Sequence, residues 1–343
     1  MLPAIFGLEG TELTDAERSF FREVSPFGYI IFGRNVVDRT QLQSLTESLR
    51  NLHGRAVPIL IDQEGGRVAR MQPPEWLAYP PAQRFADLYA VRPGEALLAA
   101  QLNYESLGLD LAEVGVTVTC APVLDVPIEG AHDVIGDRAF GLDPDTCTAL
   151  GRACLDGLQQ AGIAGVIKHI PGHGRSVVDS HHELPRVAAG LAKLEQDLRP
   201  FCALNDASMA MTAHIVYDAW DSDHCATLSH RVIQDVIRGV IGFDGLLMSD
   251  DLDMKALAGS VPDLALAAQQ AGCDVVLNCW AKLSDMEGIA KRLASPGPDA
   301  LNRMQRVCDA LPSAQSPLTI TARQRSLLQQ RDELLALLGS VLG

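Results

Sequence analysis

Residues 168–181 have the types and spacing best suited to chemistry. The stretch begins Lys168-His169-Ile170-Pro171-Gly172-His173-Gly174 and ends in Asp179-Ser180-His181, and four of the chain's nine histidines lie between positions 169 and 182. An apolar run at 164–167 precedes it and is typical of a buried parallel strand. Polar groups that follow such a strand are where α/β proteins place their active sites. We therefore treat this stretch as the centre of a candidate active site.

Two kinds of reaction fit these residue types, and the first is acid/base chemistry. In it, Asp250 is a carboxylate nucleophile or electrostatic stabiliser, and His181 transfers a proton. Asp179 lies two residues before His181, so both side chains project from the same side of an extended segment. The carboxylate can then orient the imidazole, which leaves one ring nitrogen for the substrate.

The second kind of reaction needs a divalent metal that activates water. Imidazole and carboxylate groups are zinc ligands, and four candidates occur close together: His169, His173, His181 and Asp179. Lys168 argues against a metal, because its ammonium group would lie beside the cation. The stretch also offers no i, i+4 histidine pair on a helix. We favour acid/base chemistry and expect neither a metal nor another cofactor.

Composition and charge exclude several other classes of protein. The chain has 343 residues and a net charge of −15, which repels nucleic acid and anionic membranes. No stretch reaches the ~18 apolar residues of a membrane span, and the first residues lack the pattern of a signal peptide. The eight cysteines include no CxxC pair, which indicates reduced thiols, and no phosphate-binding glycine motif follows a strand. We expect a cytoplasmic monomer.

Short apolar strands alternate with amphipathic helices along most of the chain. Eight strands are predicted, at residues 4–8, 29–32, 57–61, 116–120, 164–167, 209–214, 245–248 and 274–277. Helices are expected between them, for example one capped by Thr14 or Asp15, one after Asp38 and one capped by Ser229. The tail at 284–343 is predicted to be helical and to pack on the barrel exterior. The pattern predicts an α/β fold, a single-domain (β/α)8 barrel over residues 1–343.

The carboxyl ends of the strands of such a barrel meet on one face. This brings together residues that are far apart in the sequence: Asp62, Asp125, Lys168, His169, His214 and Asp250 at strand ends, with Arg138, Asp179 and His181 on loops. His214 and Asp125 could either contact a substrate or form hydrogen bonds beneath it. Asp251 and Asp253 are interpreted as caps of the following helix.

Four motifs together resemble glycoside hydrolase family 3, and within it the bacterial β-N-acetylglucosaminidases of peptidoglycan recycling. They are Asp62-Gln63-Glu64-Gly65-Gly66-Arg67-Val68, Lys168-His169-x-Pro171-Gly172-His173-Gly174, Asp179-Ser180-His181 and Ser249-Asp250-Asp251-Leu252-Asp253-Met254. The resemblance implies an enzyme that removes non-reducing terminal β-linked N-acetylglucosamine with retention, through a covalent glycosyl-enzyme. It also implies a small carbohydrate substrate, a muropeptide that contains GlcNAc-1,6-anhydro-MurNAc or a GlcNAc disaccharide.

Matching positions within the motifs imply a role for each residue. Asp250 matches the nucleophile, His181 the general acid/base and Asp179 its dyad partner. Substrate-binding positions are matched by Asp62, Arg70, Arg138, Lys168 and His169. The chain departs from the family at Ile170, where Phe is usual, and at Arg175-Ser176, where Asp-Thr is usual. These changes lie in the loop that carries the dyad.

A retaining glycosidase usually employs two carboxylates, and Glu64 is the nearest rival of His181 for the role of acid. The adjacent Gly65-Gly66 turn indicates close backbone packing, so we assign Glu64 a structural role. His181 beside Asp179 can instead hold a proton near neutral pH. Three alternatives stay open: a β-glucosidase or β-xylosidase of the same family, a metal-dependent barrel hydrolase, and a catalytically silent sugar-binding barrel.

Overall fold

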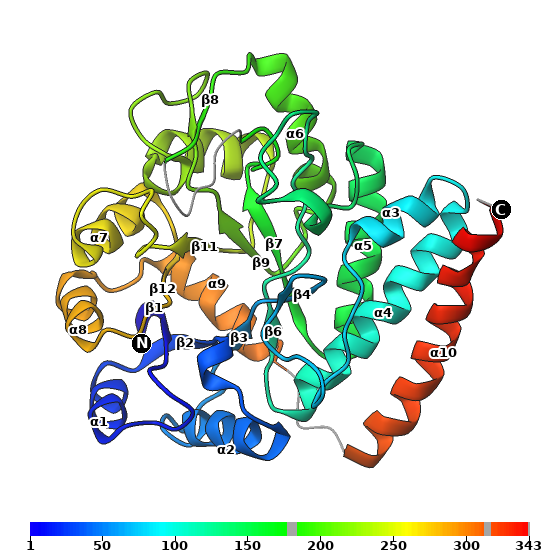
Figure 1. The fold of residues 1–343 in the computed structure, drawn as a ribbon. Helices are drawn as coiled ribbons and strands as arrows, with labels where there is room; N and C mark the ends of the chain where they lie inside the picture. Colours follow the sequence, from blue (N-terminus) through cyan, green and yellow to red (C-terminus); the bar gives the residue numbers. More distant parts are fainter. Residues whose placement is uncertain (177–183, 312–316, 342–343) are drawn as a thin grey trace.

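A closed parallel barrel is the centre of the structure, a computed structural model that describes residues 1–176, 184–311 and 317–341 (Figure 1). Neighbouring strands follow the order β1-β12-β11-β9-β7-β6-β3-β2. Their bounds are β1 (Leu2–Gly7), β2 (Pro26–Ile31), β3 (Ile59–Ile61), β6 (Val118–Thr119), β7 (Ala164–Ile170), β9 (Met209–Thr212), β11 (Leu246–Asp251) and β12 (Val275–Asn278). Each predicted strand overlaps one of these, so the predicted (β/α)8 barrel is confirmed.

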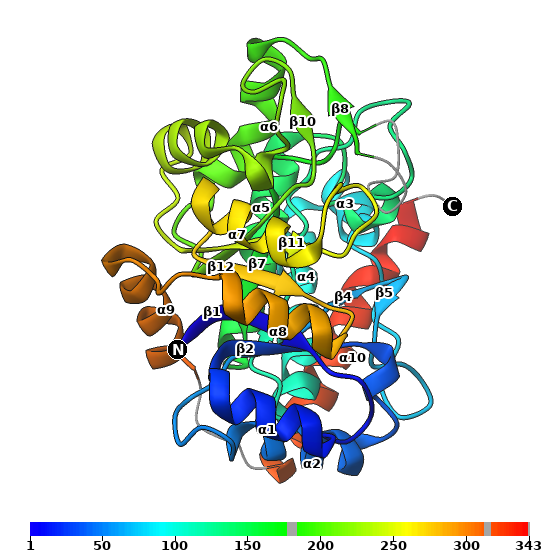
Figure 2. The same cartoon turned by 90° about the vertical axis from the view of Figure 1, so that its left-hand side faces the viewer.

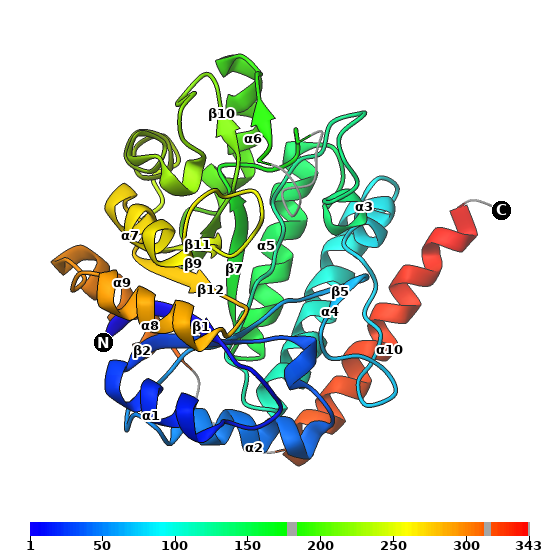
Figure 3. The same ribbon diagram turned by 60° about the vertical axis from the view of Figure 1, so that its left-hand side comes forward.

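Helices surround the barrel, as the two rotated views show (Figures 2 and 3). Their bounds are α1 (Asp15–Val24), α2 (Arg39–Arg50), α3 (Gln83–Tyr89), α4 (Pro93–Glu113), α5 (Pro144–Gln160), α6 (Leu191–Ala203), the π-helical η4 (Val232–Val240), α7 (Val261–Ala271), α8 (Leu283–Arg292), α9 (Pro298–Asp309) and α10 (Pro317–Val341). Thr14 caps α1 and Asp38 caps α2, each by accepting a backbone N–H three residues on. Ser229 Oγ likewise accepts from Val232 N at the start of η4.

Short elements complete the chain between the barrel strands and the helices. They are the strands β4 (Gln63–Gly65), β5 (Val68–Ala69), β8 (Arg186–Val187) and β10 (Val216–Tyr217), and the 3-10 turns η1 (Gly33–Asn35), η2 (Gly136–Arg138) and η3 (Ala226–Leu228). β4 and β5 form an antiparallel hairpin directly after β3. No helix in the described ranges is long and apolar enough to cross a membrane.

The last two helices of the tail, α9 and α10, pack in two different places. Met304 and Val307 of α9 join the apolar cluster that fills the barrel interior, together with Ile5, Leu60 and Val166. Helix α9 therefore closes the end of the barrel where the strands begin, rather than lying on the exterior. Helix α10 instead lies along α4 in all three views (Figures 1 to 3).

Two barrel strands run further than the sequence predicted. β7 continues to Ile170, because Lys168 and Ile170 pair with Met211 and Thr212 of the neighbouring strand. β11 continues to Asp251, which pairs with Leu277. Polar residues end the apolar pattern of a strand but not its backbone pairing, since side chains at this end of a barrel face a cavity instead of the core. Lys168, His169 and Asp250 therefore lie on strands, not on loops.

Candidate active site

A cavity of about 420 Å³ opens at the carboxyl ends of the barrel strands. Every described residue with a predicted catalytic or binding role lines it, namely Asp62, Arg70, Arg138, Lys168, His169 and Asp250. They come from β7, β11, η2 and the segment after β3, so the barrel brings together positions from four separate parts of the sequence. Asp179 and His181 lie outside the described residues.

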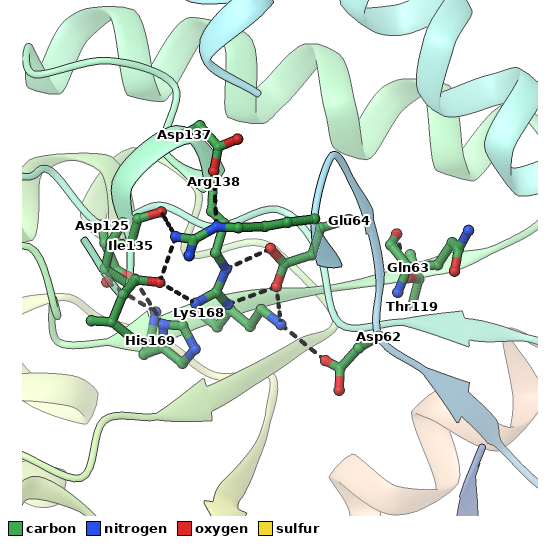
Figure 4. A network of polar contacts seen from close by, with 12 residues as sticks. Asp62, Gln63, Glu64, Thr119, Asp125, Ile135, Asp137, Arg138, Lys168 and His169 are labelled. Atoms are coloured by element: carbon green, nitrogen blue, oxygen red, sulfur yellow. Dashed lines mark hydrogen bonds and ion pairs between the residues drawn. The ribbon is translucent and has the colours of Figure 1, made fainter. Parts of the chain in front are cut away.

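Ion pairs connect the charged residues beneath this cavity (Figure 4). The ammonium group of Lys168 lies 3.1 Å from Asp62 Oδ1 and 2.6 Å from Glu64 Oε1. The guanidinium group of Arg138 donates two hydrogen bonds to Glu64, each 2.8 Å long. Arg70 Nη2 donates to Asp62 Oδ2 at 3.1 Å. We call these five residues the cavity network.

The electrostatics of the network fix the charges of Glu64 and Lys168. Burial alone would raise the pKa of Glu64, but the charges of Arg138 and Lys168 and their hydrogen bonds lower it to about 2. Burial would lower the pKa of Lys168, yet the charges of Glu64 and Asp62 raise it above its usual value. Glu64 is therefore an ionised acceptor near neutral pH and cannot supply a proton, in agreement with the structural role assigned to it.

The β4–β5 hairpin positions Arg70. Gln63 Oε1 accepts hydrogen bonds from the backbone N–H groups of Arg70 at 2.8 Å and of Met71 at 3.1 Å. Gly65 has a φ of 97°, and a Cβ atom there would lie 2.6 Å from the carbonyl oxygen of Pro80. The close packing that the Gly65-Gly66 turn predicted is therefore present.

Asp125 is fully buried and holds the β7 end in place. Its Oδ2 atom lies 2.7 Å from His169 Nδ1, and its Oδ1 atom accepts the backbone N–H groups of His169 and His173 at 3.1 and 2.6 Å. This geometry favours the tautomer of His169 with its proton on Nδ1. Asp125 does not line the cavity, so it orients His169 instead of contacting a substrate.

His173 lies beside His169, with the ring centroids 5.5 Å apart. Burial, followed by the charge of His169, lowers the pKa of His173 to about 4. The neutral form of His173 therefore prevails near pH 7. Because metals bind neutral imidazole, this shift does not decide between a packing role and ligation for His173.

His214 is buried beneath the β11 end and does not line the cavity, which favours hydrogen bonding below the cavity over contact with a substrate. Its Nδ1 lies 2.7 Å from Thr227 Oγ1, and its Nε2 lies 3.0 Å from the carbonyl oxygen of Asp251. A proton on Nε2 lets the ring donate to that carbonyl while Thr227 donates to Nδ1. The bond fixes the backbone directly after Asp250.

Asp250 is partly exposed on β11, and its Oδ1 accepts the N–H of Asp251 at 2.8 Å.

The helix-cap interpretation of Asp251 and Asp253 is wrong, because α7 begins only at residue 261 and Ser260 caps it. Asp251 instead accepts the N–H of Cys279 at 3.0 Å, and Asp253 pairs with Lys282 at 2.7 Å. Burial, and to a lesser extent the charge of Asp250, raises the pKa of Asp251 to about 6.

Several lining residues were not singled out from the sequence. They are Phe32, Arg34, Met254, Lys255 and Trp280. The guanidinium carbons of both Arg34 and Arg70 lie 5.1 Å from the centroid of the Phe32 ring. Phe32 and Trp280 each follow a barrel strand closely, so the strand-end rule would have found them had it been applied to aromatic as well as polar residues.

Metal ligation is tested by the described residues only in part. Residues 1–176, 184–311 and 317–341 contain no group of three or more His, Cys, Asp or Glu side chains placed to hold a metal ion. Two of the four candidate ligands, Asp179 and His181, lie outside these ranges. The metal alternative is therefore left to experiment.

Comparison with known proteins places this cavity in a family. The glycosyl hydrolase family 3 N-terminal domain matches residues 12–310. β-Hexosaminidases of Bordetella avium and Bordetella pertussis are 36% and 37% identical over 90% and 92% of this chain, and over 88% and 89% of their own lengths.

Solved structures agree with this placement. The crystal structure of NagZ from Neisseria gonorrhoeae in complex with N-trifluoroacetyl-D-glucosamine has a TM-score of 0.88 and 28% identity, covering 98% of both chains. A crystal structure of that NagZ in complex with zinc ion has a TM-score of 0.84 and 28% identity, covering 96% of this chain and 98% of the other. From the family match, the relatives and the barrel cavity together, we conclude that the chain belongs to glycosyl hydrolase family 3 and is an enzyme of the β-N-acetylhexosaminidase type.

Proposed function

We propose that this enzyme removes non-reducing terminal β-linked N-acetylglucosamine with retention, and that Asp250 is its nucleophile. One observation carries the proposal. The Asp250 carboxylate and the Asp62–Lys168 pair line the same cavity from different strands. A sugar held by the pair would therefore lie within reach of a second, separate carboxylate.

The cavity network supplies the groups that bind the sugar. Lys168 and Arg70 overcome the effect of burial and lower the pKa of Asp62, so its carboxylate stays ionised and can accept hydrogen bonds from sugar hydroxyls. Lys168, Arg138 and His169 can donate to hydroxyl or carbonyl oxygens on the same sugar. Because Glu64 and Asp125 fix these donors, little entropy is lost when a sugar binds.

The first chemical step forms the glycosyl-enzyme. An Asp250 carboxylate oxygen attacks the anomeric carbon, a new C–O bond forms, and the bond to the leaving oxygen breaks with its electron pair going to that oxygen. His181 gives its proton to the leaving oxygen, and Asp179 orients the imidazole. These two roles come from the motif match.

The second step releases the sugar. His181, now without its proton, takes one from a water molecule as the water oxygen attacks the anomeric carbon. The bond to Asp250 breaks, and its electron pair returns to the carboxylate. Two inversions at one carbon give net retention.

The natural substrate follows from the resemblance of the motifs and from the named relatives. We propose a muropeptide fragment that carries N-acetylglucosamine on 1,6-anhydro-N-acetylmuramic acid. The expected cytoplasmic location, the monomeric state and a single catalytic domain over the whole chain are parts of the same proposal.

The most direct test of the substrate class compares two aryl β-glycosides that differ only at the 2-position. The acetamido compound should be hydrolysed with a far higher kcat/KM than the hydroxyl compound. NMR of the first product should show the β-anomer of N-acetylglucosamine. Preference for the hydroxyl compound would favour a β-glucosidase or β-xylosidase, and an α-anomer would exclude the retaining mechanism.

A chelation experiment addresses the metal alternative. Because proton transfer and sugar binding are assigned to side chains, activity should survive exhaustive EDTA treatment, and elemental analysis should find no stoichiometric zinc. Loss of activity that added zinc restores would contradict the acid/base assignment.

A further inference from the structure

The turn between β4 and β5 rests on residues 79–81. The N–H of Gly66 in this turn donates to the backbone carbonyl oxygen of Tyr79 at 2.8 Å. A Cβ atom at Gly66 would lie 2.7 Å from Pro81 Cβ, so this part of the turn also packs closely on the segment. Whatever holds Tyr79 in place therefore also holds the turn of the hairpin.

Two members of the cavity network flank this turn. Glu64 precedes it on β4 and contacts both Lys168 and Arg138 (Figure 4). Arg70 follows β5 directly and pairs with Asp62. A two-stranded hairpin is only marginally stable by itself, so its position depends on the contacts around it. A displaced turn would therefore move groups on which sugar binding depends.

The side chain of Tyr79 is buried against α4. Its hydroxyl group donates to Asp110 Oδ2 at 2.8 Å, and its oxygen lies 3.1 Å from Ser106 Oγ, which can donate to it. Tyr79 is 5% exposed and Asp110 is 3% exposed. Because a buried carboxylate is a strong acceptor and water has little access to it, this hydrogen bond fixes the phenol ring.

Helix α10 covers the same phenol ring where it lies along α4 (Figure 1). Gln324 Nε2 donates to the hydroxyl oxygen of Tyr79 at 3.3 Å and to the carbonyl oxygen of Ser106 at 3.1 Å. The guanidinium carbon of Arg331 lies 5.9 Å from the centroid of the Tyr79 ring, and its Nη1 donates to Asn103 Oδ1 at 3.0 Å. No described residue of α10 lines the candidate active-site cavity. The helix can therefore act on the cavity only through other residues.

We propose that Tyr79 is a positioning residue for sugar binding, and that α10 acts on the cavity through Tyr79. The phenol ring joins α4 to α10, and the carbonyl oxygen of the same residue holds the turn of the hairpin. Without the hydroxyl group, the turn of the free enzyme takes up more conformations, and only some of them place Glu64 and Arg70 to bind a sugar. The inference rests on the proposed function in one respect, namely that the cavity network binds N-acetylglucosamine.

Tyr79→Phe removes the hydroxyl group and keeps the ring. On an aryl β-N-acetylglucosaminide, KM should rise by about three- to tenfold and kcat should change by less than about twofold, because the bound sugar selects the ordered hairpin. The dissociation constant of N-acetylglucosamine, measured by calorimetry, should rise by the same factor as KM. Gln324→Leu removes the donor on α10 and should raise KM by about twofold. Since Gln324 is only partly buried, this variant carries the test if Tyr79→Phe does not fold.

Hydrogen exchange separates positioning from a general loss of stability. In Tyr79→Phe, the amides of the peptide 63–71 should exchange faster than in the parent, and saturating N-acetylglucosamine should restore their protection. Arg323→Met is the matched control, because it removes the ion pair of α10 with Glu105 and does not touch Tyr79. Whatever this control does to the unfolding free energy, its KM and its exchange over 63–71 should equal those of the parent.

Each outcome decides for or against the inference. An unchanged KM in Tyr79→Phe would overturn the positioning role, and so would an equal rise of KM in Arg323→Met. Faster exchange over 63–71 that the sugar does not reverse would also overturn it, because the hairpin would then not be coupled to binding. If the parent neither hydrolyses the glycoside nor binds N-acetylglucosamine, the proposed function fails instead. Exchange without sugar would then still decide whether Tyr79 holds the hairpin.

Discussion

Two networks of alternating charge lie at opposite ends of one barrel. The cavity network lies where the strands end and consists of Arg70, Asp62, Lys168, Glu64 and Arg138. A second network, here called the base network, lies where the strands begin and consists of Arg238, Asp274, Arg303, Asp244 and Arg306. Both pair guanidinium groups with carboxylates, and the cavity network adds the ammonium group of Lys168, but the two differ in how far they are exposed to solvent.

Burial distinguishes the innermost pair of the cavity network from the outer pair of the base network, although Asp274 at the inner end of the base network is only 4% exposed. The side chains of Lys168 and Glu64 are 2% and 6% exposed, whereas those of Asp244 and Arg306 are 69% and 59% exposed. A charge without water depends on its partners, so removing one partner there is costly. Exposed pairs contribute little, because water screens them. The base network joins α9 to the barrel, and the cavity network holds donors and acceptors ready for a ligand.

The largest effect is expected at Asp250, which belongs to neither network. Asp250→Asn should lower kcat by at least about 10³-fold, because an amide cannot bond to the anomeric carbon as a carboxylate does. The urea midpoint should stay near that of the parent, since Asp250 is partly exposed and outside both networks. Turnover close to that of the parent would remove Asp250 from the mechanism.

A second large effect is expected at His181, and it should depend on the leaving group. His181→Ala should be severely slowed on a disaccharide, whose sugar leaves poorly without a proton. An aryl glycoside of an acidic phenol should instead give a burst of phenol followed by slow turnover, and azide should accelerate the slow phase. Equal losses on both substrates with no azide effect would show that His181 is not the acid/base.

Substitution of Glu64 should affect both activity and stability. Glu64→Gln keeps the shape but weakens the hold on Lys168 and Arg138, so kcat/KM should fall by roughly tenfold to a hundredfold. Unfolding free energy at pH 7 should fall by about 3 kcal/mol, the usual cost of breaking a buried pair. If Glu64→Gln had the same kcat/KM and the same unfolding free energy as the parent, the cavity network would not position the sugar.

The pH dependence of the unfolding free energy tests how much the buried ion pairs of Glu64 stabilise the fold. The folded-state pKa of Glu64, about 2, lies below its ordinary value of 4.5. Its ion pairs therefore stabilise the fold above pH 4.5, and this contribution is lost as the pH falls from 4.5 toward 2. Urea unfolding at several pH values should show a shallower acid loss for Glu64→Gln than for the parent. If the unfolding free energies of Glu64→Gln and the parent fell in parallel as the pH was lowered, the lowered pKa of Glu64 would be contradicted.

The smallest effect is expected in the base network. Arg303→Met removes the ion pairs to Asp244, which is exposed, and to Asp274, which is buried but keeps Arg238 as a partner, so the unfolding free energy should fall by only about 1 kcal/mol. Activity should not change, because no residue of this network lines the candidate active-site cavity. Arg306→Met, at a more exposed pair, should cost less. If either variant lost activity while its unfolding free energy stayed unchanged, the base network would also support catalysis, which contradicts the proposed difference between the two networks.

The sequence predicted the barrel well because strand and helix periodicities are local properties. Strand ends were less accurate at β7 and β11, because backbone pairing continued through Lys168 and Asp250 where the apolar pattern had stopped. The place of α9 could not be predicted. Periodicity identifies an apolar face that contains Met304 and Val307, but it does not say which core that face enters.

In the candidate site, too, some features could be predicted from the sequence and others could not. The strand-end rule and the motifs found most of the charged residues that line the cavity, since parallel strands must end on one face, but they missed Arg34 and Lys255. Whether Asp125 and His214 touch a ligand depended on burial, which no motif reports. The same holds for Trp280, because its exposure beside the cavity is a property of the folded chain.

Covalent labelling of the nucleophile tests the central claim most directly. The protein would be incubated with a 5-fluoro glycosyl fluoride of N-acetylglucosamine, which slows release of the glycosyl-enzyme, and then digested for peptide mass spectrometry. A label on Asp250, absent from Asp250→Asn, is the predicted result. A label on Asp251, Asp253 or Glu64, or turnover without any covalent adduct, would contradict the assignment of Asp250 as the nucleophile of a retaining mechanism.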